Sequence, residues 1–299
     1  MDDLLQALRS CLRDAVRRCP AEVLFFSGGL DTSVLAVLTP PIPLLHISLE
    51  DRGADLPYAE EVARHLGLDL IVRQVSEEEA LDALPEVIRI RRSFDPALPN
   101  DLALYFAFAE ARRLGFGSAM TGDGADELFA GYSYMFDLDL GTYIPWLAKR
   151  MRFSASELGA WFGMDVSQPY LDPAVVDLAL AIPPALKVRE ENGARFGKWI
   201  LRKAFEGDLP PHLCWQSKRP VEVGSGFSRL RERVTAMVTD EDWAAPVRFF
   251  TCDQPYYYRV YGQVVGEIPP PAPGETACPA CGAGMPPDAR HCRVCGYWQ

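Results

Sequence analysis

The stretch that decides the fold is the apolar run Val23-Leu24-Phe25-Phe26 followed by Ser27-Gly28-Gly29-Leu30-Asp31-Thr32-Ser33. It predicts a short buried strand, a glycine-rich turn and a helix that begins near Thr32. Two adjacent glycines, Gly28 and Gly29, remove Cβ atoms where a backbone must approach a ligand closely. The hydroxyl groups of Ser27, Thr32 and Ser33 add hydrogen-bond donors, and the N-terminus of the coming helix favours an anion. The turn therefore has the composition of a phosphate-binding loop.

Asp31 is the unexpected member of this loop. A carboxylate beside a bound phosphate is repelled unless a cation lies between them, so Asp31 indicates pyrophosphate bound together with Mg²⁺. The loop lacks the Gly-Lys-Ser/Thr of a Walker A motif, and the third glycine of the dinucleotide-binding fingerprint is also absent. The full run Ser27 to Ser33 after a strand resembles the pyrophosphate loop of the ATP pyrophosphatases, and this resemblance implies ATP, not NAD, as the nucleotide.

The surrounding sequence alternates between predicted helices and predicted strands. Helices are expected at 3–18, 32–38, 58–66 and 101–114, and strands at 23–26, 44–49, 69–75 and 118–120. This alternation favours a parallel sheet covered by helices on both faces. From residue 154 to about 233 the pattern is helical and strand signals are weak. We therefore expect an α/β fold with a helical continuation.

A second motif, Thr121-Gly122-Asp123-Gly124-Ala125-Asp126-Glu127-Leu128-Phe129-Ala130-Gly131-Tyr132, places three carboxylates within five positions. Such crowding has an electrostatic cost, because like charges a few ångströms apart repel. The motif makes sense around a metal ion or around a substrate that develops positive charge. The alternative is an acidic helix N-terminus, where carboxylates complement the helix dipole.

The second motif resembles the G-E-G-S-D-E-L-F-G-G-Y signature in the synthetase domain of glutamine-dependent asparagine synthetases, which also carry S-G-G-L-D-S-S. Three further stretches are similar to their R-x-P-F-L-D, L-P-P-x-x-K and K-x-x-L-R-x-A-F, and a fourth resembles K-x-x-F-x-x-G-x-G only loosely. In this chain the four stretches are Gln168–Asp172, Ile182–Lys187, Lys198–Phe205 and Lys218–Gly226. The resemblance follows the family's order over about residues 15 to 235.

The resemblance implies the fold of the PP-loop ATP pyrophosphatases, an adenine nucleotide α-hydrolase-like fold with a five-stranded type of parallel sheet. It implies that Ser27 to Ser33, together with Gly122 and Gly124, bind ATP and its pyrophosphate, and that Asp31 and Asp126 hold Mg²⁺. Lys198 and Lys218 would neutralise phosphate charge as pyrophosphate departs. Asp123 stands where the family has the glutamate of G-E-G, which is thought to act on the incoming amine.

The reaction that the resemblance implies has two steps. A carboxylate, with aspartate as the leading substrate, attacks the α-phosphorus of ATP, and ammonia then displaces AMP to give an amide. Two departures qualify this expectation. Asp2 stands where the family has the cysteine nucleophile of its glutaminase domain, so we expect free ammonia, a separate amidotransferase subunit or another nucleophile to serve. Asp123 is also one methylene shorter than glutamate, which leaves the acceptor and the nucleophile open.

Two other functions remain open at this stage. One is a PP-loop enzyme that modifies tRNA or a carrier protein by sulfur or amine transfer. The other is a non-catalytic nucleotide-binding protein that keeps the fold as a partner of other proteins. The acidic charge and the second motif argue against sulfur transfer, and the retained Asp31, Asp123 and Asp126 argue against a decayed site.

The end of the chain carries a separate pattern of cysteines. Cys278 and Cys281 are followed ten residues later by Cys292 and Cys295, and a glycine follows each pair. This is the spacing of a four-cysteine zinc ribbon, with two disulfides as the alternative, and His291 is expected outside the ligand set. A closed tetrahedral site would be structural, and its use would be docking to a partner or onto the rest of the chain. We predict a synthetase-like domain at 1–265, a proline-rich linker at 266–277 and a zinc ribbon at 278–299.

Charge and composition limit the partners. The net charge of −11 argues against broad electrostatic binding to nucleic acid, without excluding a local basic patch. No apolar run approaches the roughly 20 residues needed to cross a bilayer, and the acidic N-terminus does not have the layout of a signal peptide. We expect a cytoplasmic enzyme that uses ATP, Mg²⁺ and structural Zn²⁺, with a possible protein partner at the ribbon, such as an amidotransferase or a carrier.

Overall fold

The structure is a computed structural model that describes residues 1–50, 53–191 and 193–299. The chain divides into two compact units. The first consists of Met1–Ile47, Ala54–Arg73 and Ala107–Pro220, and the second of Ser48–Gly53, Gln74–Phe106 and Val221–Gln299. The sequence did not indicate this division, and the boundaries expected at residues 265 and 277 stay a prediction.

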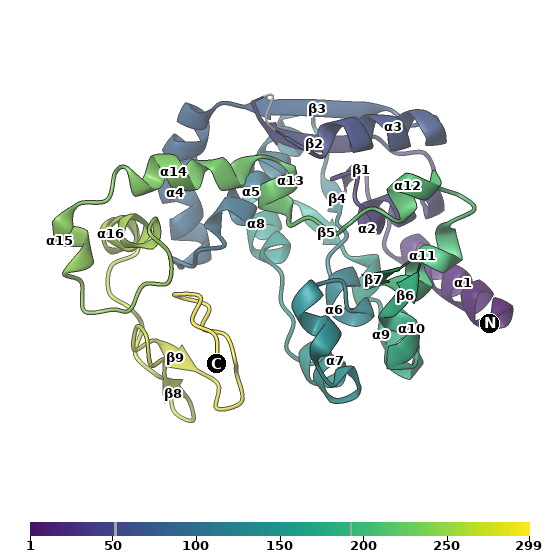
Figure 1. Cartoon of the computed structure of the whole chain (residues 1–299). Coiled ribbons are helices and arrows are strands. Elements are labelled where there is room, and N and C mark those ends of the chain that lie inside the picture. Colours follow the sequence, from purple (N-terminus) through teal and green to yellow (C-terminus); the bar gives the residue numbers. More distant parts are fainter. Residues whose placement is uncertain (51–52, 192) are drawn as a thin grey trace. The chain divides into compact units, whose positions relative to one another are not determined.

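A five-stranded parallel sheet forms the framework of the fold, with the strand order β3-β2-β1-β4-β5 (Figure 1). Its strands are β1 (Val23–Phe25), β2 (Leu44–Leu49), β3 (Leu70–Val75), β4 (Ser118–Met120) and β5 (Asp165–Ser167). In the register, Leu24 of the central strand lies opposite Leu44 on one side and Met120 on the other. The chain builds outward from β1 to β3 and then returns to the other side of β1, so the order reverses between β1 and β4. In open parallel sheets, ligands bind at the carboxyl ends of the strands beside such a reversal.

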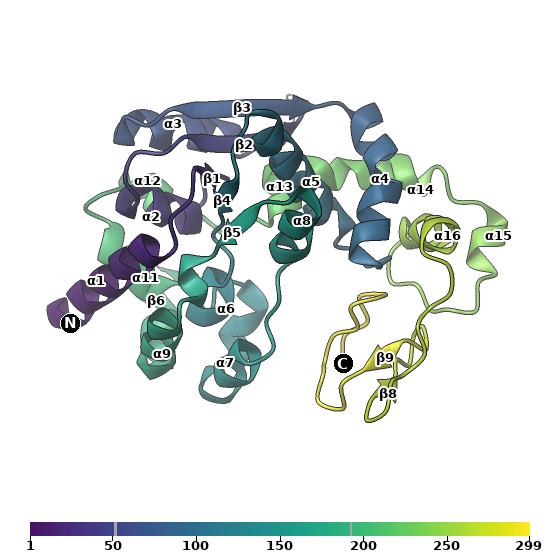
Figure 2. The same ribbon diagram turned by 180° about the vertical axis from the view of Figure 1, so that it is seen from behind.

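Helices cover both faces of the sheet, as alternate side chains of β1 show. Leu24 belongs to the apolar core that includes α1 (Asp2–Arg18), α2 (Leu30–Leu38) and α3 (Leu56–Leu66). The next residue, Phe25, points to the other face, where its ring centroid is 4.7 Å from that of Phe108 in α5 (Leu98–Arg113). Phe108 in turn stacks on Phe162 of α8 (Ser154–Phe162), a helix that lies beside β5 in Figure 2. The predicted α/β fold with a helix-covered parallel sheet is confirmed.

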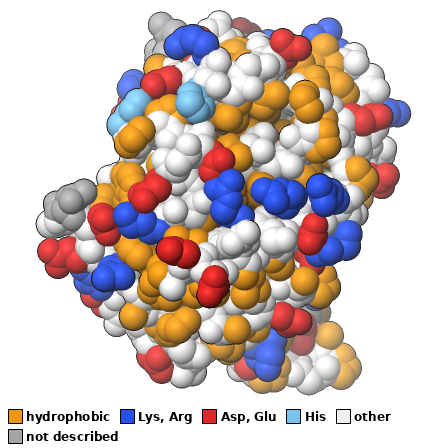
Figure 3. Space-filling model, turned by 90° about the vertical axis from the view of Figure 1, so that its right-hand side faces the viewer, with side chains coloured by type: hydrophobic (Ala, Val, Ile, Leu, Met, Phe, Trp, Pro, Cys, Tyr) orange, Lys and Arg blue, Asp and Glu red, His pale blue; other side chains and the backbone are white. Residues whose placement is uncertain are grey.

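Basic and acidic side chains are mixed on the surface. On the face shown in Figure 3, a band of Lys and Arg side chains crosses the middle, and Asp and Glu side chains lie among and beside it. The whole chain contains 30 Lys and Arg residues and 41 Asp and Glu residues, so side chains of both signs are numerous although the net charge is −11. Among the residues that the structure describes, no helix has both the length and the apolar composition needed to cross a membrane.

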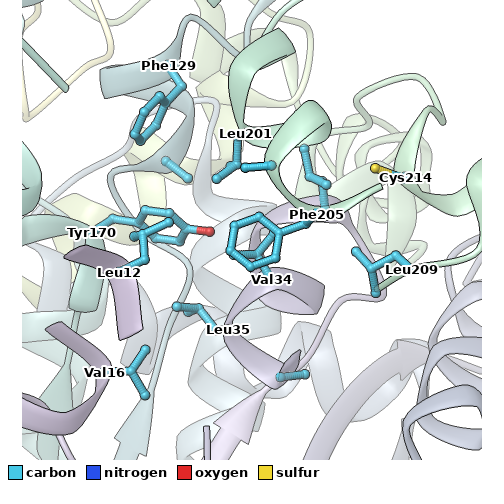
Figure 4. Close-up of a cluster of buried hydrophobic side chains, with 14 of the residues drawn as sticks. Leu12, Val16, Val34, Leu35, Phe129, Tyr170, Leu201, Phe205, Leu209 and Cys214 are labelled. Carbon is cyan, nitrogen blue, oxygen red and sulfur yellow. The ribbon is translucent and has the colours of Figure 1, made fainter. Parts of the chain in front are cut away.

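A large apolar core supports the carboxyl end of β1. Figure 4 shows side chains of α1, α2, α6 (Ala125–Phe129) and α11 (Trp199–Phe205) converging there, with Tyr170 among them. Tyr170 is fully buried, and its hydroxyl donates a 3.0 Å hydrogen bond to the backbone carbonyl of Asp31. A buried phenol is usually hydrogen-bonded in this way. The core therefore fixes the first turn of α2, in which Asp31 and Thr32 lie.

The remaining elements complete both units. They are α4 (Glu77–Arg91), η1 (Ser133–Asp137), α7 (Leu140–Ala148), η2 (Pro169–Leu171), α9 (Pro173–Ala181), α10 (Pro184–Lys187), β6 (Arg189–Glu191), β7 (Ala194–Phe196), α12 (Pro211–Cys214), α13 (Val221–Gly224), η3 (Phe227–Arg229), α14 (Leu230–Thr235), α15 (Asp240–Trp243), α16 (Gln254–Val264), β8 (Thr276–Ala277) and β9 (Gly284–Met285). In the second unit α4 packs on α16, and β8 pairs with β9 near the end of the chain.

Some sequence-based expectations need correction. The helix expected at Thr32 begins at Leu30, and the helix expected at 101–114 runs from Leu98 to Arg113. The region from 154 to 233, expected to be helical, also contains β5, β6 and β7. Each of these strands has three residues, which is too short for an alternating pattern to appear in the sequence.

Candidate functional site

The glycine-rich loop lies tightly against the first turn of α3. Gly28 has a φ of +78°, and a Cβ atom there would lie 2.6 Å from the backbone nitrogen of Ala59, so a side chain does not fit. Ser27 Oγ accepts a 3.1 Å hydrogen bond from the amide of Gly29 and lies 3.2 Å from Thr32 Oγ1. The buried hydroxyl of Ser33 makes no hydrogen bond with any residue that the structure describes. The loop is thus compact, and one of its donors is left unused.

The second motif follows β4 and lies directly beside this loop. A Cβ atom on Gly122 would come within 3.2 Å of both Asp31 Cβ and Thr32 Cγ2, so glycine permits the close approach of the two segments. Gly124 has a φ of +96° at the N-terminus of α6, a conformation that L side chains rarely adopt. The carboxyl ends of β1 and β4 therefore bring Asp31 and Asp126 to one place.

Four predicted site residues meet in one contact network. Lys198 Nζ lies 2.6 Å from Asp31 Oδ2 and 2.7 Å from Asp126 Oδ1. Lys218 Nζ lies 2.9 Å from the other carboxylate oxygen of Asp126. The side chain of Lys198 is only 3 % exposed, and those of the two aspartates are 19 % and 12 % exposed. The structure therefore joins residues from four separated segments, and we call Asp31, Asp126, Lys198 and Lys218 the carboxylate–lysine cluster.

Lys198 reaches this position through an unusual backbone. It has a φ of +54°, a left-handed conformation that is uncommon for residues other than glycine, at the start of α11. Its amide donates a 2.9 Å hydrogen bond to the carbonyl of Phe129, which fixes the turn. A Cβ atom on Gly131 would collide with Asp126 Oδ1 and Lys198 Cε, so the lysine stem passes where only glycine leaves room. Sparsely populated conformations of this kind tend to occur at functional sites.

Burial and neighbouring charges shift the ionisation of the cluster. Burial has the largest effect on the pKa of Asp126 and acts to raise it, but the charges of Lys198 and Lys218 together outweigh it, so this pKa lies below its ordinary value. For Asp31, burial prevails over the attraction of Lys198, and the pKa lies above its usual range. The charges of the two aspartates more than offset burial at Lys198 and raise its pKa. The lysine therefore stays protonated between the carboxylates.

Glu127 and Tyr132 were part of the second motif but received no role from the sequence. Tyr132 donates a 3.0 Å hydrogen bond to Glu127 Oε1, and Lys218 Nζ lies 4.8 Å from the centre of the Tyr132 ring. Burial, reinforced by the charge of Asp126, raises the pKa of Glu127 to about 7. The crowding of carboxylates was the sequence signal for this residue, whereas the contact between Tyr132 and Lys218 leaves no trace in the sequence.

Asp123 is held by two donors on one oxygen. Thr121 Oγ1 and Gln168 Nε2 each donate a 2.8 Å hydrogen bond to Asp123 Oδ2. Gln168 begins the stretch that resembles R-x-P-F-L-D, so that motif contributes an amide which orients the carboxylate. Donors to a carboxylate favour its charged form. The arrangement is suited to a carboxylate that accepts a proton or stabilises a positive charge.

The donor set of the cluster fits Mg²⁺. Two carboxylates converge on a single cation position, which the ammonium of Lys198 shares in this structure. Mg²⁺ in nucleotide sites is commonly bound by one or two carboxylates together with phosphate oxygens. Asp31 and Asp126 are therefore the residues that would hold it.

The four cysteines predicted to bind zinc also come together, in the second unit. Their sulfur atoms all lie within 4.8 Å of one another, with 3.7 Å between Cys278 and Cys295 and 3.8 Å between Cys281 and Cys292. Four thiolates at about 2.3 Å in a tetrahedron are separated by about 3.8 Å, whereas a disulfide needs about 2.05 Å. The geometry thus fits a four-coordinate zinc ion and not two disulfides.

The cysteine module contacts other parts of its own unit. Gln254 Nε2 of α16 donates hydrogen bonds to the carbonyls of Cys295 and Phe94, at 2.7 and 3.2 Å. The amide of Phe94 donates to the carbonyl of Val294 at 2.8 Å. His291 Nε2 lies 3.0 Å from Asp95 Oδ2 and takes no part in the sulfur cluster. The module is therefore fastened to α16 and to the turn that precedes α5.

Comparisons with known proteins point to one family. The model of the family described as asparagine synthase matches residues 6–162 and 146–251. The chain is 28 % identical over 296 residues to a probable glutamine-hydrolyzing asparagine synthetase of Dictyostelium discoideum, covering 85 % of this chain and 53 % of that protein. It is 28 % identical over 292 residues to asparagine synthetase B of Escherichia coli, covering 84 % and 52 %.

A solved structure is also similar, at a level that supports no argument about function. It is the U34-tRNA thiolase NcsA from Methanococcus maripaludis, with 12 % identity and a TM-score of 0.34 over 77 % of this chain and 80 % of that one. The chain spans about half the length of the curated relatives it matches. Because the family model covers most of the chain, in the region that contains every member of the carboxylate–lysine cluster, the chain belongs to the asparagine synthase family.

Proposed function

We propose that this chain is an ATP-dependent amide ligase that releases AMP and pyrophosphate. The observation that carries the proposal is the carboxylate–lysine cluster, which lies beside a glycine-rich loop at the carboxyl end of the sheet. Two carboxylates and two ammonium groups in one network are suited to a metal–pyrophosphate complex, whose charge must be balanced while it forms and leaves. The relatives bear the names of asparagine synthetases, so aspartate is the first acceptor to test.

In the first step, an oxygen of the acceptor carboxylate attacks the α-phosphorus of ATP. The bond from that phosphorus to the bridging oxygen breaks, and pyrophosphate leaves with the electron pair. The loop at Ser27–Ser33 binds the phosphates through backbone amides and hydroxyl groups, and Lys198 and Lys218 stabilise the charge that develops on the leaving group. Mg²⁺ held by Asp31 and Asp126 would neutralise part of the charge on the pyrophosphate.

In the second step, the nitrogen of ammonia attacks the carbonyl carbon of the acyl-adenylate. The nitrogen loses a proton, the bond from carbon to the adenylate oxygen breaks, and AMP leaves. Asp123 is the candidate to accept that proton, because Thr121 and Gln168 hold its carboxylate in a fixed orientation. We also propose that the nitrogen comes from free ammonia, which is the simplest source.

The buried cysteine of the first unit, Cys214, does not favour a sulfur-transfer reaction. Cys214 is buried, and burial raises the pKa of its thiol to about 12. Its sulfur donates a hydrogen bond to the carbonyl of Arg202. A thiol in this state is protonated near neutral pH and is a poor nucleophile. Its environment is that of a structural residue.

Pyrophosphate release tests the proposal, measured with ATP, Mg²⁺, ammonium and a panel of carboxylates. We expect release that depends on one carboxylate, and we expect Asp126→Asn to lower it about a thousandfold, as when a main electrostatic contact to a transition state is lost. Asp14→Asn is the matched control, because Asp14 is paired with Arg17 at an exposed position. Release stimulated by RNA alone, or normal turnover by Asp126→Asn, would contradict the proposal.

A further inference from the structure

The segment Gln216–Arg219 lies across the glycine-rich loop and carries Lys218 between two anchored side chains. On the N-terminal side of Lys218, Gln216 Nε2 donates a 3.1 Å hydrogen bond to the carbonyl of Gly28 in the loop. On the C-terminal side of Lys218, Arg219 Nε donates a 2.7 Å hydrogen bond to Asp55 Oδ1. Lys218 itself contacts Asp126. One short segment therefore connects the phosphate loop, the start of α3 and the carboxylate–lysine cluster.

Arg219 makes three contacts at once. Besides Asp55, it donates a 3.1 Å hydrogen bond to Gln216 Oε1, and its guanidinium lies 4.5 Å from the centre of the Tyr58 ring. The planar guanidinium group suits this combination, because it donates in several directions in its plane and stacks on an aromatic face. The contact with Gln216 links the two ends of the segment to each other, and the contact with Tyr58 holds the segment against α3.

Asp55 is committed to this contact and does not cap its own helix. It occupies the N-cap position of α3, where an aspartate commonly accepts a hydrogen bond from a backbone amide of the first turn. Its side chain makes no capping hydrogen bond and turns to Arg219 instead. Asp55 is buried, whereas the Arg219 side chain is 29 % exposed. A buried carboxylate that gives up a cap for an ion pair makes that pair structurally costly to break.

A buried arginine, Arg202, also holds the start of this segment in place. Arg202 of α11 donates hydrogen bonds to the carbonyls of Cys214 and Gln216, and its Nε donates a 3.0 Å hydrogen bond to the carbonyl of Gly197. Gly197 directly precedes Lys198. The same guanidinium thus ties the peptides that lead to both lysines of the cluster.

We propose that Arg219, through its ion pair with Asp55, is a positioning residue that holds Lys218 against Asp126 and against the phosphates of bound nucleotide. The contribution of Arg219 to catalysis rests on the proposed function. The contribution of Arg219 to the position of Lys218 does not rest on it.

The first arm of the test needs no nucleotide. The chain has five lysines, so acylation of each amine can be followed separately by peptide mass spectrometry. In Arg219→Gln we expect the labelling rate of Lys218 to rise severalfold while exposed Lys149 keeps its rate, because Lys218 is released from Asp126. Arg9→Gln is the matched control, since it breaks the ion pair of Arg9 with Asp208 at a similar exposure elsewhere in the same unit. An unchanged rate at Lys218 would overturn the proposal.

The second arm measures binding of Mg²⁺–ATP by calorimetry. We expect about tenfold weaker binding in Arg219→Gln and a similar loss in Asp55→Asn, with partial recovery in Arg219→Lys, which keeps the charge but loses the fork. In a Lys218→Ala background, Arg219→Gln should add less than about twofold, because a residue that acts through Lys218 is not additive with it.

Full additivity, or a loss no larger than that of Arg9→Gln, would overturn the positioning function. If the unmodified chain binds no Mg²⁺–ATP, the proposed function fails, and the labelling result alone then decides whether Arg219 places Lys218. A melting temperature measured for each variant separates these outcomes from general unfolding. An effect that simply followed the melting temperature across all variants, Arg9→Gln included, would also overturn the proposal.

Discussion

The carboxylate–lysine cluster and the four-cysteine cluster both gather four side chains of the kind that bind metals or phosphates, but they are assembled in opposite ways. The cysteines lie within residues 278 to 295, a segment in which the short strand β9 pairs with β8 just before it. The carboxylate–lysine cluster draws on residues from 31 to 218, each held by a different part of the first unit. The four-cysteine cluster is local in the sequence, and the carboxylate–lysine cluster exists only after the chain has folded.

The difference in assembly predicts a difference in what holds each cluster together. A module of about 22 residues buries too little apolar surface to fold alone, so metal binding must supply its stability. The carboxylate–lysine cluster stands on a large apolar core, with Tyr170 fixing the first turn of α2 and Gly131 leaving room for Lys198. One cluster should therefore fail when metal is removed, and the other when packing is changed.

The largest expected effect is on the cysteine module. In Cys292→Ser, or after zinc is removed by a chelator, we expect residues 278–299 to lose protection in hydrogen exchange, because zinc binding contributes about 10 kcal/mol or more in isolated modules of this kind. Zinc content should fall from one per chain to none. Cys252→Ser is the control, because Cys252 is exposed and outside the cluster. If protection survives without zinc, the contacts of Phe94 and Gln254 hold the module, and the contrast between the two clusters is lost.

The second prediction changes packing at the carboxylate–lysine cluster without altering any charge. A methyl group in Gly131→Ala would collide with Asp126 and Lys198, so we expect pyrophosphate release to fall about a hundredfold, the effect of misplacing reacting groups by about an ångström. Gly207→Ala is the matched control, since a Cβ atom there meets no atom within 4 Å. Equal activity in the two variants would show that the cluster tolerates changes in packing.

The smallest expected effect concerns Lys187, a buried lysine whose charge is offset by no carboxylate among the residues that the structure describes. Burial alone lowers the pKa of Lys187 to about 8 from its ordinary 10.5. Below pH 8 the folded chain carries the full cost of burying this charge, and the cost fades as the pH rises towards 10.5, because the folded state then releases its proton first. Lys187→Met should therefore raise the free energy of unfolding by about 2 kcal/mol at pH 7 and by less at pH 10.

Urea unfolding at the two pH values measures the effect of Lys187→Met, with exposed Lys149→Met as the control. The comparison with Lys198 gives the experiment its meaning, because Lys198 is equally buried but lies between two carboxylates that raise its pKa. A gain of the same size at pH 7 and pH 10 would mean that the charge of Lys187 is not the source of the cost.

Much of the fold could be predicted from local patterns. The helix from Asp2 to Arg18 and the strands at 44–49 and 118–120 have the expected bounds within one residue, because long amphipathic helices and buried apolar strands leave clear patterns. Helix α4 was not predicted, although Ser76 and Glu79 form a capping box at its start, which is a recognisable signal. Strand β5 has no such signal, since its three residues join the sheet only through pairing with β4.

The site shows the same division. The motifs named Asp31, Asp126, Lys198 and Lys218, and the structure places all four in contact. The sequence could not show that Gln168 orients Asp123, that Tyr132 contacts Lys218 or that Arg219 pairs with Asp55. Each of these contacts joins residues whose separation along the chain carries no periodic pattern, so only the packing of helices on the sheet brings them together.

The sequence by itself determined the phosphate loop, the acidic motif, the cysteine spacing and the alternation that makes a parallel sheet. These are local features, because turns, periodicity and ligand spacing depend on neighbouring residues. The tertiary structure alone decided that Lys198 lies between two aspartates and that Arg219 holds the segment of Lys218. Charges become a site only when folding removes them from water and brings them within a few ångströms, and that distance is a property of the whole core.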